Sequence, residues 1–136
     1  MKLLLTAFEP FGGAETNITQ SVLSLLSDSI AGWAIEKVCL PVSFKRAPIV
    51  LREAIAACAP DFVIMLGQCP AGDNIRLERF AINMMDSTKA DNDGYIPNEE
   101  TIIAKDMLWI ALLRYGQWPL VQIFVSLTSK TAFHIK

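Results

Sequence analysis

The sequence has 136 residues, which is enough for one ordinary domain and too few for two. Hydrophobic residues make up 52% of the chain and charged residues 19%, a balance that excludes disorder of the whole chain. The formal net charge is -2 and the basic residues are scattered, so we expect no nucleic-acid partner.

Cysteine usage indicates the compartment. Cys39, Cys58 and Cys69 are widely spaced and form no C-x-x-C pair, which favours neither a disulfide framework nor a zinc site. The aspartates between residues 86 and 93 lack the loop spacing of a calcium site and are interpreted as a polar loop. We therefore expect a cytoplasmic protein with no metal and no other cofactor.

Two apolar stretches raise the question of a membrane. The run Leu3-Leu4-Leu5 is too short for a signal peptide. Residues 107–127 carry one charge, Arg114, over a length that can span a bilayer. Gly116 and Pro119 divide this stretch, which favours a buried helix followed by a buried strand. We expect no membrane partner.

The first part of the chain predicts a strand and then a helix. Residues 2–6 form a short apolar run that ends in a loop at residues 8–13, where proline and paired glycines stop regular structure. Thr16, Asn17 or Thr19 is expected to cap the following helix. The apolar residues at 22, 23, 25 and 26 are predicted to form its buried face.

The next elements continue this alternation. Residues 33–40 predict a second strand, and residues 45–57 show helical spacing that Pro60 terminates. Residues 61–66 are nearly all apolar, which is typical of a strand buried on both faces. Residues 75–83 form another extended candidate. Strands that alternate with helices predict an α/β fold.

Two loops are expected to form the walls of a ligand site, because open α/β sheets bind ligands beyond the carboxyl ends of their strands. They are residues 8–13, which contain Phe8 and Phe11, and residues 67–72. The alternative is that both phenylalanines plug the edge of the core. For Glu78, the alternative to a chemical role is a solvated pair with Arg79.

Several of these segments resemble those of pyrrolidone-carboxylate peptidases in order and separation. The segments are Ala7-Phe8-Glu9-Pro10-Phe11-Gly12-Gly13, Leu40-Pro41 with Phe44, Leu51-Arg52-Glu53-Ala54-Ile55, Gly67-Gln68 and Glu78-Arg79-Phe80-Ala81-Ile82-Asn83. The chain resembles the N-terminal half of a pyroglutamyl-peptidase I over about residues 1–94. The resemblance implies a three-layer α/β/α sandwich of the phosphorylase/hydrolase-like kind, incomplete at its C-terminus.

The family resemblance also implies an activity and a set of site residues. These hydrolases remove an N-terminal pyroglutamyl residue from peptides with a cysteine nucleophile. Glu78 matches the catalytic acidic residue, which orients the histidine that activates the cysteine. Phe8 and Phe11 match the aromatic residues that bind the uncharged lactam ring, and Gln68 lies in a loop that lines the site. The implied ligand is a pyroglutamyl peptide or a small lactam.

The chain also departs from the family pattern. Cys69-Pro70-Ala71-Gly72 replaces an Ala-Gly-Gly-Arg segment, and residues 87–92 replace Ala-Arg-Ile-Pro-Asp-Asn. The resemblance fades beyond about residue 104, so residues 1–104 are interpreted as family-like and residues 105–136 as a divergent tail. No cysteine follows Cys69, and His134 is the single histidine. A substitute triad of Cys69 and His134 is not expected, because nothing in the sequence places an imidazole beside this thiol to make it a thiolate at neutral pH.

Two functions therefore remain open. One is the family activity, with this chain a truncated or frame-disrupted representative. The other is a non-catalytic module that binds a small lactam or a partner chain. An incomplete sheet exposes apolar surface, and residues 121–125 form a β-prone segment that is an aggregation hazard if unpaired. We therefore expect marginal stability, with either self-association or the need for a partner.

Overall fold

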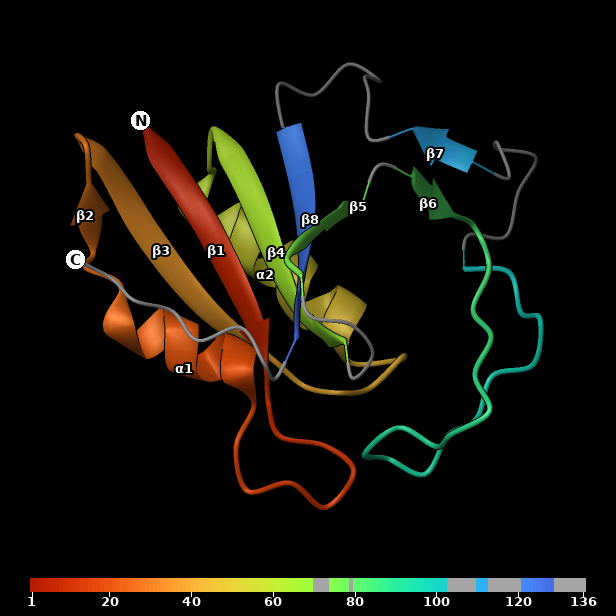
Figure 1. Cartoon of the computed structure of the whole chain (residues 1–136). Helices are drawn as coiled ribbons and strands as arrows, with labels where there is room; N and C mark the ends of the chain where they lie inside the picture. The colour runs from red at the N-terminus through yellow and green to blue at the C-terminus, as the bar shows by residue number, and fades with distance from the viewer. Residues whose placement is uncertain (70–73, 79, 103–109, 113–120, 129–136) are drawn as a thin grey trace.

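The computed structural model describes residues 1–69, 74–78, 80–102, 110–112 and 121–128. Within these residues the chain forms a six-stranded sheet and a separate two-stranded sheet (Figure 1). The strands of the larger sheet lie in the order β2-β3-β1-β4-β8-β5. Their bounds are β1 Lys2–Phe8, β2 Ser29–Ile30, β3 Trp33–Leu40, β4 Phe62–Cys69, β5 Arg76–Glu78 and β8 Val121–Thr128.

The first strand, β1, is the centre of the sheet. It lies between β3 and β4 and runs parallel to both. Successive side chains of a strand point to opposite faces, yet Leu4 and Leu5 are both buried. Burial on both faces is typical of a parallel sheet with helices on each side. The predicted strands at 2–6, 33–40 and 61–66 are confirmed.

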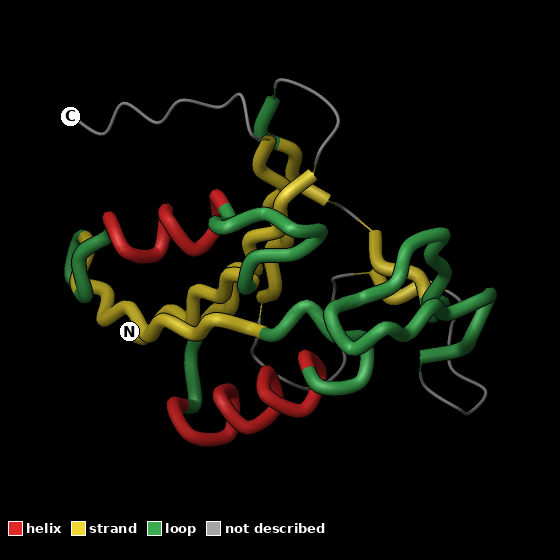
Figure 2. Tube along the Cα trace, turned by 90° about the horizontal axis from the view of Figure 1, so that it is seen from below, coloured by secondary structure: helices red, strands yellow, loops and turns green. Residues whose placement is uncertain are grey.

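Two helices cover opposite faces of this sheet: α1, Ile18–Leu25, and α2, Ala47–Cys58 (Figure 2). The helix α2 begins with a proline in its first turn, where the missing N–H has no cost. It ends at Ala59, whose left-handed backbone precedes Pro60. The α/β class and its three layers, predicted from the alternation and the resemblance, are confirmed for the described residues.

The buried face of α1 is narrower than predicted. Leu23 belongs to the core cluster, and Val22 and Leu26 pack against it. Leu25 is 67% exposed, so its predicted place on the buried face is wrong. At about 100° per residue, Leu25 lies roughly 200° around the helix from Leu23. The other members of this cluster come from three adjacent strands, so the core lies between α1 and the sheet: Leu5, Ala7, Ile35 and Leu66.

A short strand, β2, was not predicted. It pairs antiparallel with the start of β3 through Ile30 and Trp33, which leaves a two-residue turn. Both turn residues, Ala31 and Gly32, have positive φ. Hairpin turns of this type favour Asn-Gly or Asp-Gly, because asparagine and aspartate tolerate positive φ better than alanine does. The sequence Ala-Gly therefore gave a weak signal for this hairpin.

The extended candidate at residues 75–83 divides between the two sheets. β5 pairs antiparallel with β8 in the larger sheet. β6, Phe80–Ile82, pairs antiparallel with β7, Ile110–Leu112, in the smaller sheet. β7 is a strand within the stretch where a buried helix was predicted, so the helix prediction is wrong for those three residues. The rest of the predicted helix lies outside the described residues.

The strand β8 extends the larger sheet beyond β4. It runs parallel to β4 over eight residue pairs, and β5 pairs with its other side at residues 124–126. The predicted aggregation hazard at residues 121–125 required an unpaired segment, and that condition is not met. Among the described residues, no helix is both long and apolar enough to cross a membrane.

Candidate functional site

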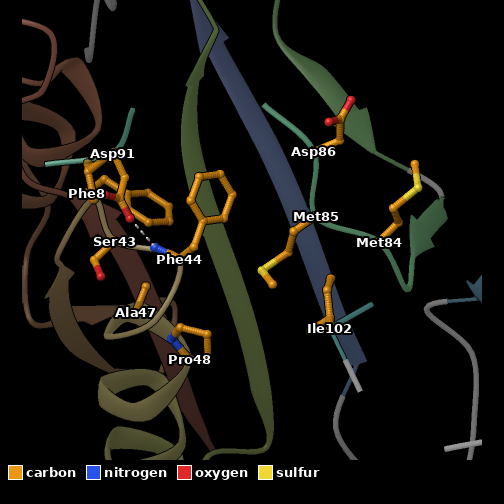
Figure 3. Close-up of a pocket in the computed structure, with 11 residues that line it drawn as sticks. Phe8, Ser43, Phe44, Ala47, Pro48, Met84, Met85, Asp86, Asp91 and Ile102 are labelled. Atoms are coloured by element: carbon orange, nitrogen blue, oxygen red, sulfur yellow. Dashed lines mark hydrogen bonds between the residues drawn. The ribbon is translucent and has the colours of Figure 1, made fainter. Parts of the chain in front are cut away.

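A largely apolar cavity of about 520 Å³ lies beyond the carboxyl end of β1 (Figure 3). One wall comes from the end of β1, the loop after β3 and the first turn of α2. The other comes from residues 84–102. The lining residues are Phe8, Val42, Ser43, Phe44, Ala47, Pro48, Met84, Met85, Asp86, Asp91 and Ile102. A volume of this size is within the usual range for small-molecule sites.

The position of Phe8 in this wall is set by the start of α1. The Phe8 N–H donates a hydrogen bond of 3.1 Å to Thr19 Oγ1. Thr19 in turn donates from its hydroxyl to Asn17 Oδ1 over 2.7 Å and from its backbone N–H to the same oxygen over 2.9 Å. Asn17 is thus the helix cap, and it was one of three candidates in the sequence. Asn17 and Thr19 are both buried, so this network is shielded from water.

Glu9 connects three segments around the cavity. Its Oε1 accepts hydrogen bonds from the Val42 N–H at 3.0 Å and from Asn92 Nδ2 at 2.9 Å. The Asn92 side chain also donates to the Pro10 carbonyl, and its backbone N–H donates to the Val42 carbonyl. On the other side, Asn17 Nδ2 donates to the Glu9 carbonyl at 3.0 Å. The loop after β1 is therefore fixed to the loop after β3, to Asn92 and to the start of α1.

Asp91 lines the cavity, but its carboxylate is already occupied. It accepts hydrogen bonds from the backbone N–H groups of Phe44, Asp93 and Tyr95 at 2.9–3.0 Å. Desolvation acts to raise the pKa of Asp91, but these three donors outweigh it and lower the pKa below its usual value. Asp91 is therefore an ionised structural group that holds Phe44 in place, and it is poorly suited to proton transfer near neutral pH.

The segment that carries Asp91 is also bound to the start of α2. Arg46 donates two hydrogen bonds to the Asp93 carboxylate, at 2.7 and 2.9 Å. This guanidinium, together with the Ser43 hydroxyl, lowers the pKa of Asp93 to about 2. The Lys45 ammonium lies 4.2 Å from the centre of the Tyr95 ring. These contacts join the two walls at one end of the cavity.

The structure places the four site residues expected from the sequence in different surroundings. Phe8 lines the cavity. Phe11 is 37% exposed and is not one of the lining residues. Gln68 Oε1 accepts a hydrogen bond of 3.0 Å from the Ile18 N–H, so this side chain supports the start of α1. Glu78 is exposed on β5.

Glu78 and Gln68 are well separated within the sheet. Glu78 pairs with residue 124 of β8, which pairs with Met65 of β4. Two strand spacings of about 4.8 Å therefore separate Glu78 from Met65, and Gln68 lies three residues, about 10 Å, further along β4. The loop at residues 67–72 was the second of the two loops expected to form a wall. Its described residues, 67–69, do not line the cavity, and residues 70–72 lie outside the described ranges.

Most of the cavity wall formed by residues 84–102 was not predicted from the sequence. Met84, Met85 and Ile102 belong to a segment without the periodicity of a helix or strand, so no local pattern marked them as lining residues. The sequence pointed to Phe44 only through the family-like pattern and gave it no place in a site. The sequence marks this wall only indirectly, by two adjacent methionines ahead of a polar stretch. In the structure, Asp91 and Asn92 of that stretch hydrogen-bond to residues of the opposite side.

The cysteines do not form a site in the described part of the chain. All three are described, and none forms a disulfide. Desolvation, followed by the charge of Glu9, raises the pKa of the Cys39 thiol; desolvation and then Glu36 raise that of Cys58. Both are therefore poor thiolates at neutral pH. No group of three metal-ligating side chains occurs among the described residues, and His134 lies outside them.

Comparison with known proteins identifies similar chains. A sequence profile described as pyroglutamyl peptidase matches residues 1–126. The pyrrolidone-carboxylate peptidase of Thermococcus onnurineus is 47% identical over 102 residues, which are 75% of this chain and 51% of that protein. The enzyme of the same name from Thermococcus kodakarensis is 45% identical over 102 residues, with 75% and 50% covered. This chain thus spans about half the length of the curated relatives it matches.

A solved structure shows similarity over more of the chain. The pyrrolidone carboxyl peptidase from Thermococcus litoralis matches with a TM-score of 0.82 and 28% identity, over 93% of this chain and 76% of that one. The profile match continues to residue 126, past the point where the resemblance was expected to fade. The division into a family-like part, residues 1–104, and a divergent part, residues 105–136, stays a prediction.

Proposed function

This chain belongs to the pyroglutamyl peptidase family, and on that premise we propose that its cavity binds the N-terminal pyroglutamyl residue of a peptide. The observation that carries this proposal is the position of Phe8. It stands in the segment that resembles the family's lactam-binding loop, and it is also part of the cavity wall.

The chemistry of the ligand fits the lining. A pyroglutamyl residue has a flat five-membered lactam ring and no ammonium group, so an apolar wall buries it without leaving a charge unpaired. Phe8 and Phe44 present aromatic side chains to the same cavity. The buried network at Asn17 and Thr19 holds Phe8 before ligand binds, which lowers the entropic cost of forming the site.

The remaining site assignments are part of the same proposal. Glu78 is assigned as the acidic residue that orients a histidine in the reaction, and its support is its place in the family-like segment. Phe11 and Gln68 are assigned to ligand binding on the same basis. The Ile18 N–H uses one of the two lone pairs of Gln68 Oε1, and it fixes the orientation in which this amide would meet a ligand.

A second function, binding without hydrolysis, is favoured by the thiols. The cysteine mechanism that the family resemblance implies requires a thiolate beside a base. Desolvation raises the pKa of Cys39 and of Cys58, which disfavours their thiolates further, and neither lines the cavity. These observations on Cys39 and Cys58 favour, for the second function, a chain that recognises pyroglutamyl peptides without using either thiol as a nucleophile.

The compartment and assembly are also proposed. Three cysteines without a disulfide suit a reducing compartment, which supports a cytoplasmic location. Self-association is supported by exposed apolar side chains on and beside β5, at the end of the sheet: Ile75 is 46% exposed and Leu77 is 66% exposed.

Binding of 2-pyrrolidone-5-carboxamide, followed by calorimetry, tests the proposal. We expect wild-type chain and Leu25→Ala, a control on the exposed side of α1, to bind alike. Phe8→Ala is expected to weaken binding by roughly tenfold or more, because the ring loses apolar contact with the ligand. Equal binding by wild type and Phe8→Ala, or no binding by wild type, would contradict the proposal.

A further inference from the structure

The cavity is larger than the ligand assigned to it. A pyroglutamyl residue, which is the lactam ring with its exocyclic oxygen and the α-carbonyl group, has eight non-hydrogen atoms. At roughly the 30 Å³ per non-hydrogen atom that water has in the liquid, this residue fills somewhat less than half of the 520 Å³ available. The remaining space is large enough for another side chain of the same peptide.

The surroundings of that space are apolar on both sides. Met85 and Ile102 come from the segment opposite Phe8, and Figure 3 shows the Met85 side chain extending across the cavity toward Phe44 and Pro48. Ala47 and Pro48, in the first turn of α2, complete the near wall. Methionine adapts its shape to an apolar partner, so this region accepts side chains of more than one form.

The charged lining residues have one sign. Asp86 and Asp91 are acidic, and among the described lining residues there is no lysine or arginine. The Arg46 guanidinium and the Lys45 ammonium nearby are directed to Asp93 and Tyr95. An acidic side chain in the cavity is therefore repelled and finds no cationic partner.

We propose that the cavity selects pyroglutamyl peptides whose second residue is a large apolar one, with Met85 and Ile102 as the specificity-determining residues. This inference rests on the proposed function, because it assigns the Phe8 end to the lactam. The second side chain then lies between Met85, Ile102 and Pro48. An alanine leaves that space partly empty, and a glutamate brings a charge against Asp86 and Asp91.

The test compares four ligands with the full chain by calorimetry: 2-pyrrolidone-5-carboxamide and the α-amides of pyroglutamyl-leucine, pyroglutamyl-alanine and pyroglutamyl-glutamate. Leucine adds three carbons to alanine, and their full burial corresponds to about sixtyfold in Kd. Because the cavity is open to solvent at Ile102, which is 48% exposed, we expect roughly tenfold between the leucine and alanine compounds. The glutamate compound is expected to bind more weakly than the alanine compound.

Two variants of Met85 test whether this residue determines the preference for a large apolar second residue. Met85→Ala is expected to reduce the ratio of the alanine to the leucine Kd to about threefold or less, while Met85→Leu, which preserves volume, keeps it near the wild-type value. Leu25→Ala, outside the cavity, is the control. If the carboxamide binds and the leucine and alanine compounds bind equally, the inference fails and the proposed function stands. If none of the four binds, both fail.

Discussion

Replacing Asn17 by alanine is expected to destabilise the whole chain and to release the loop that follows Phe8. Asn17 is 1% exposed and makes three side-chain hydrogen bonds. Its Oδ1 accepts from the Thr19 N–H and hydroxyl, and its Nδ2 donates to the Glu9 carbonyl. The alanine variant removes the cap of α1 and the hydrogen bond to the Glu9 carbonyl, and the Thr19 hydroxyl that accepts from the Phe8 N–H loses the Asn17 oxygen that orients it.

The size of the effect follows from these contacts. Loss of a helix cap costs about 1 kcal/mol. The Glu9 carbonyl and the Thr19 hydroxyl each lose a partner in a part-buried or buried position, at about 1 kcal/mol or more apiece. We therefore expect the free energy of unfolding to fall by about 2–4 kcal/mol. With an m-value of about 2 kcal/mol per M, the urea midpoint falls by about 1–2 M.

Two further variants separate the contributions in urea unfolding followed by circular dichroism. Asn17→Ser keeps a good cap but does not reach the Glu9 carbonyl, so it is expected to lose about half as much stability as Asn17→Ala. Thr16→Ala is the control, because Thr16 is exposed and was an alternative cap in the sequence. If Asn17→Ala and Thr16→Ala lower the midpoint equally, the assigned network does not hold this helix and loop.

Three other outcomes are expected. The Asp93 pKa of about 2 lies below the usual value of about 3.9, so the ion pair with Arg46 stabilises the fold above about pH 4 and is lost as the pH falls toward 2. The difference in melting temperature between wild type and Asp93→Asn should therefore close over that interval. A difference that stays constant would refute this assignment. The 136-residue chain should release nothing above background from a pyroglutamyl chromogenic amide, and turnover abolished by Cys69→Ser would reveal an unforeseen nucleophile. Sedimentation should show self-association that Leu77→Lys weakens, and a clean monomer would count against a contact through β5.

The sequence predicted the elements whose patterns are local. The apolar runs at residues 2–6 and 61–66 require burial on both faces, and both became inner strands of a parallel sheet. The hairpin at Ala31 and Gly32 was missed because its turn residues are unusual for that geometry. Leu25 was misplaced because four closely spaced apolar residues span too wide an arc of a helix.

The candidate site was predictable only in part, for a similar reason. Phe8 is the last residue of β1 and begins a recognisable segment, and the rule that ligands bind beyond the carboxyl ends of strands placed it near a site. The opposite wall depends on contacts between residues far apart in the chain, such as those of Glu9 and Asp91 with residues 42, 44 and 92. No local pattern encodes such contacts. The hydrogen bond from Ile18 to Gln68 is also long-range, and it gave Gln68 a structural role that the resemblance did not indicate.

Nuclear magnetic resonance of the labelled full chain during titration with 2-pyrrolidone-5-carboxamide reports residue by residue whether the cavity at Phe8 binds a pyroglutamyl residue. We expect the backbone amides of Phe8, Phe44 and Met85 to shift together and saturate with a single Kd, because these residues line one cavity from three segments. Amides of Leu25 and Ile30, which are exposed away from the cavity, should stay unchanged. Shifts confined to one segment, or the absence of saturable shifts, would contradict the claim.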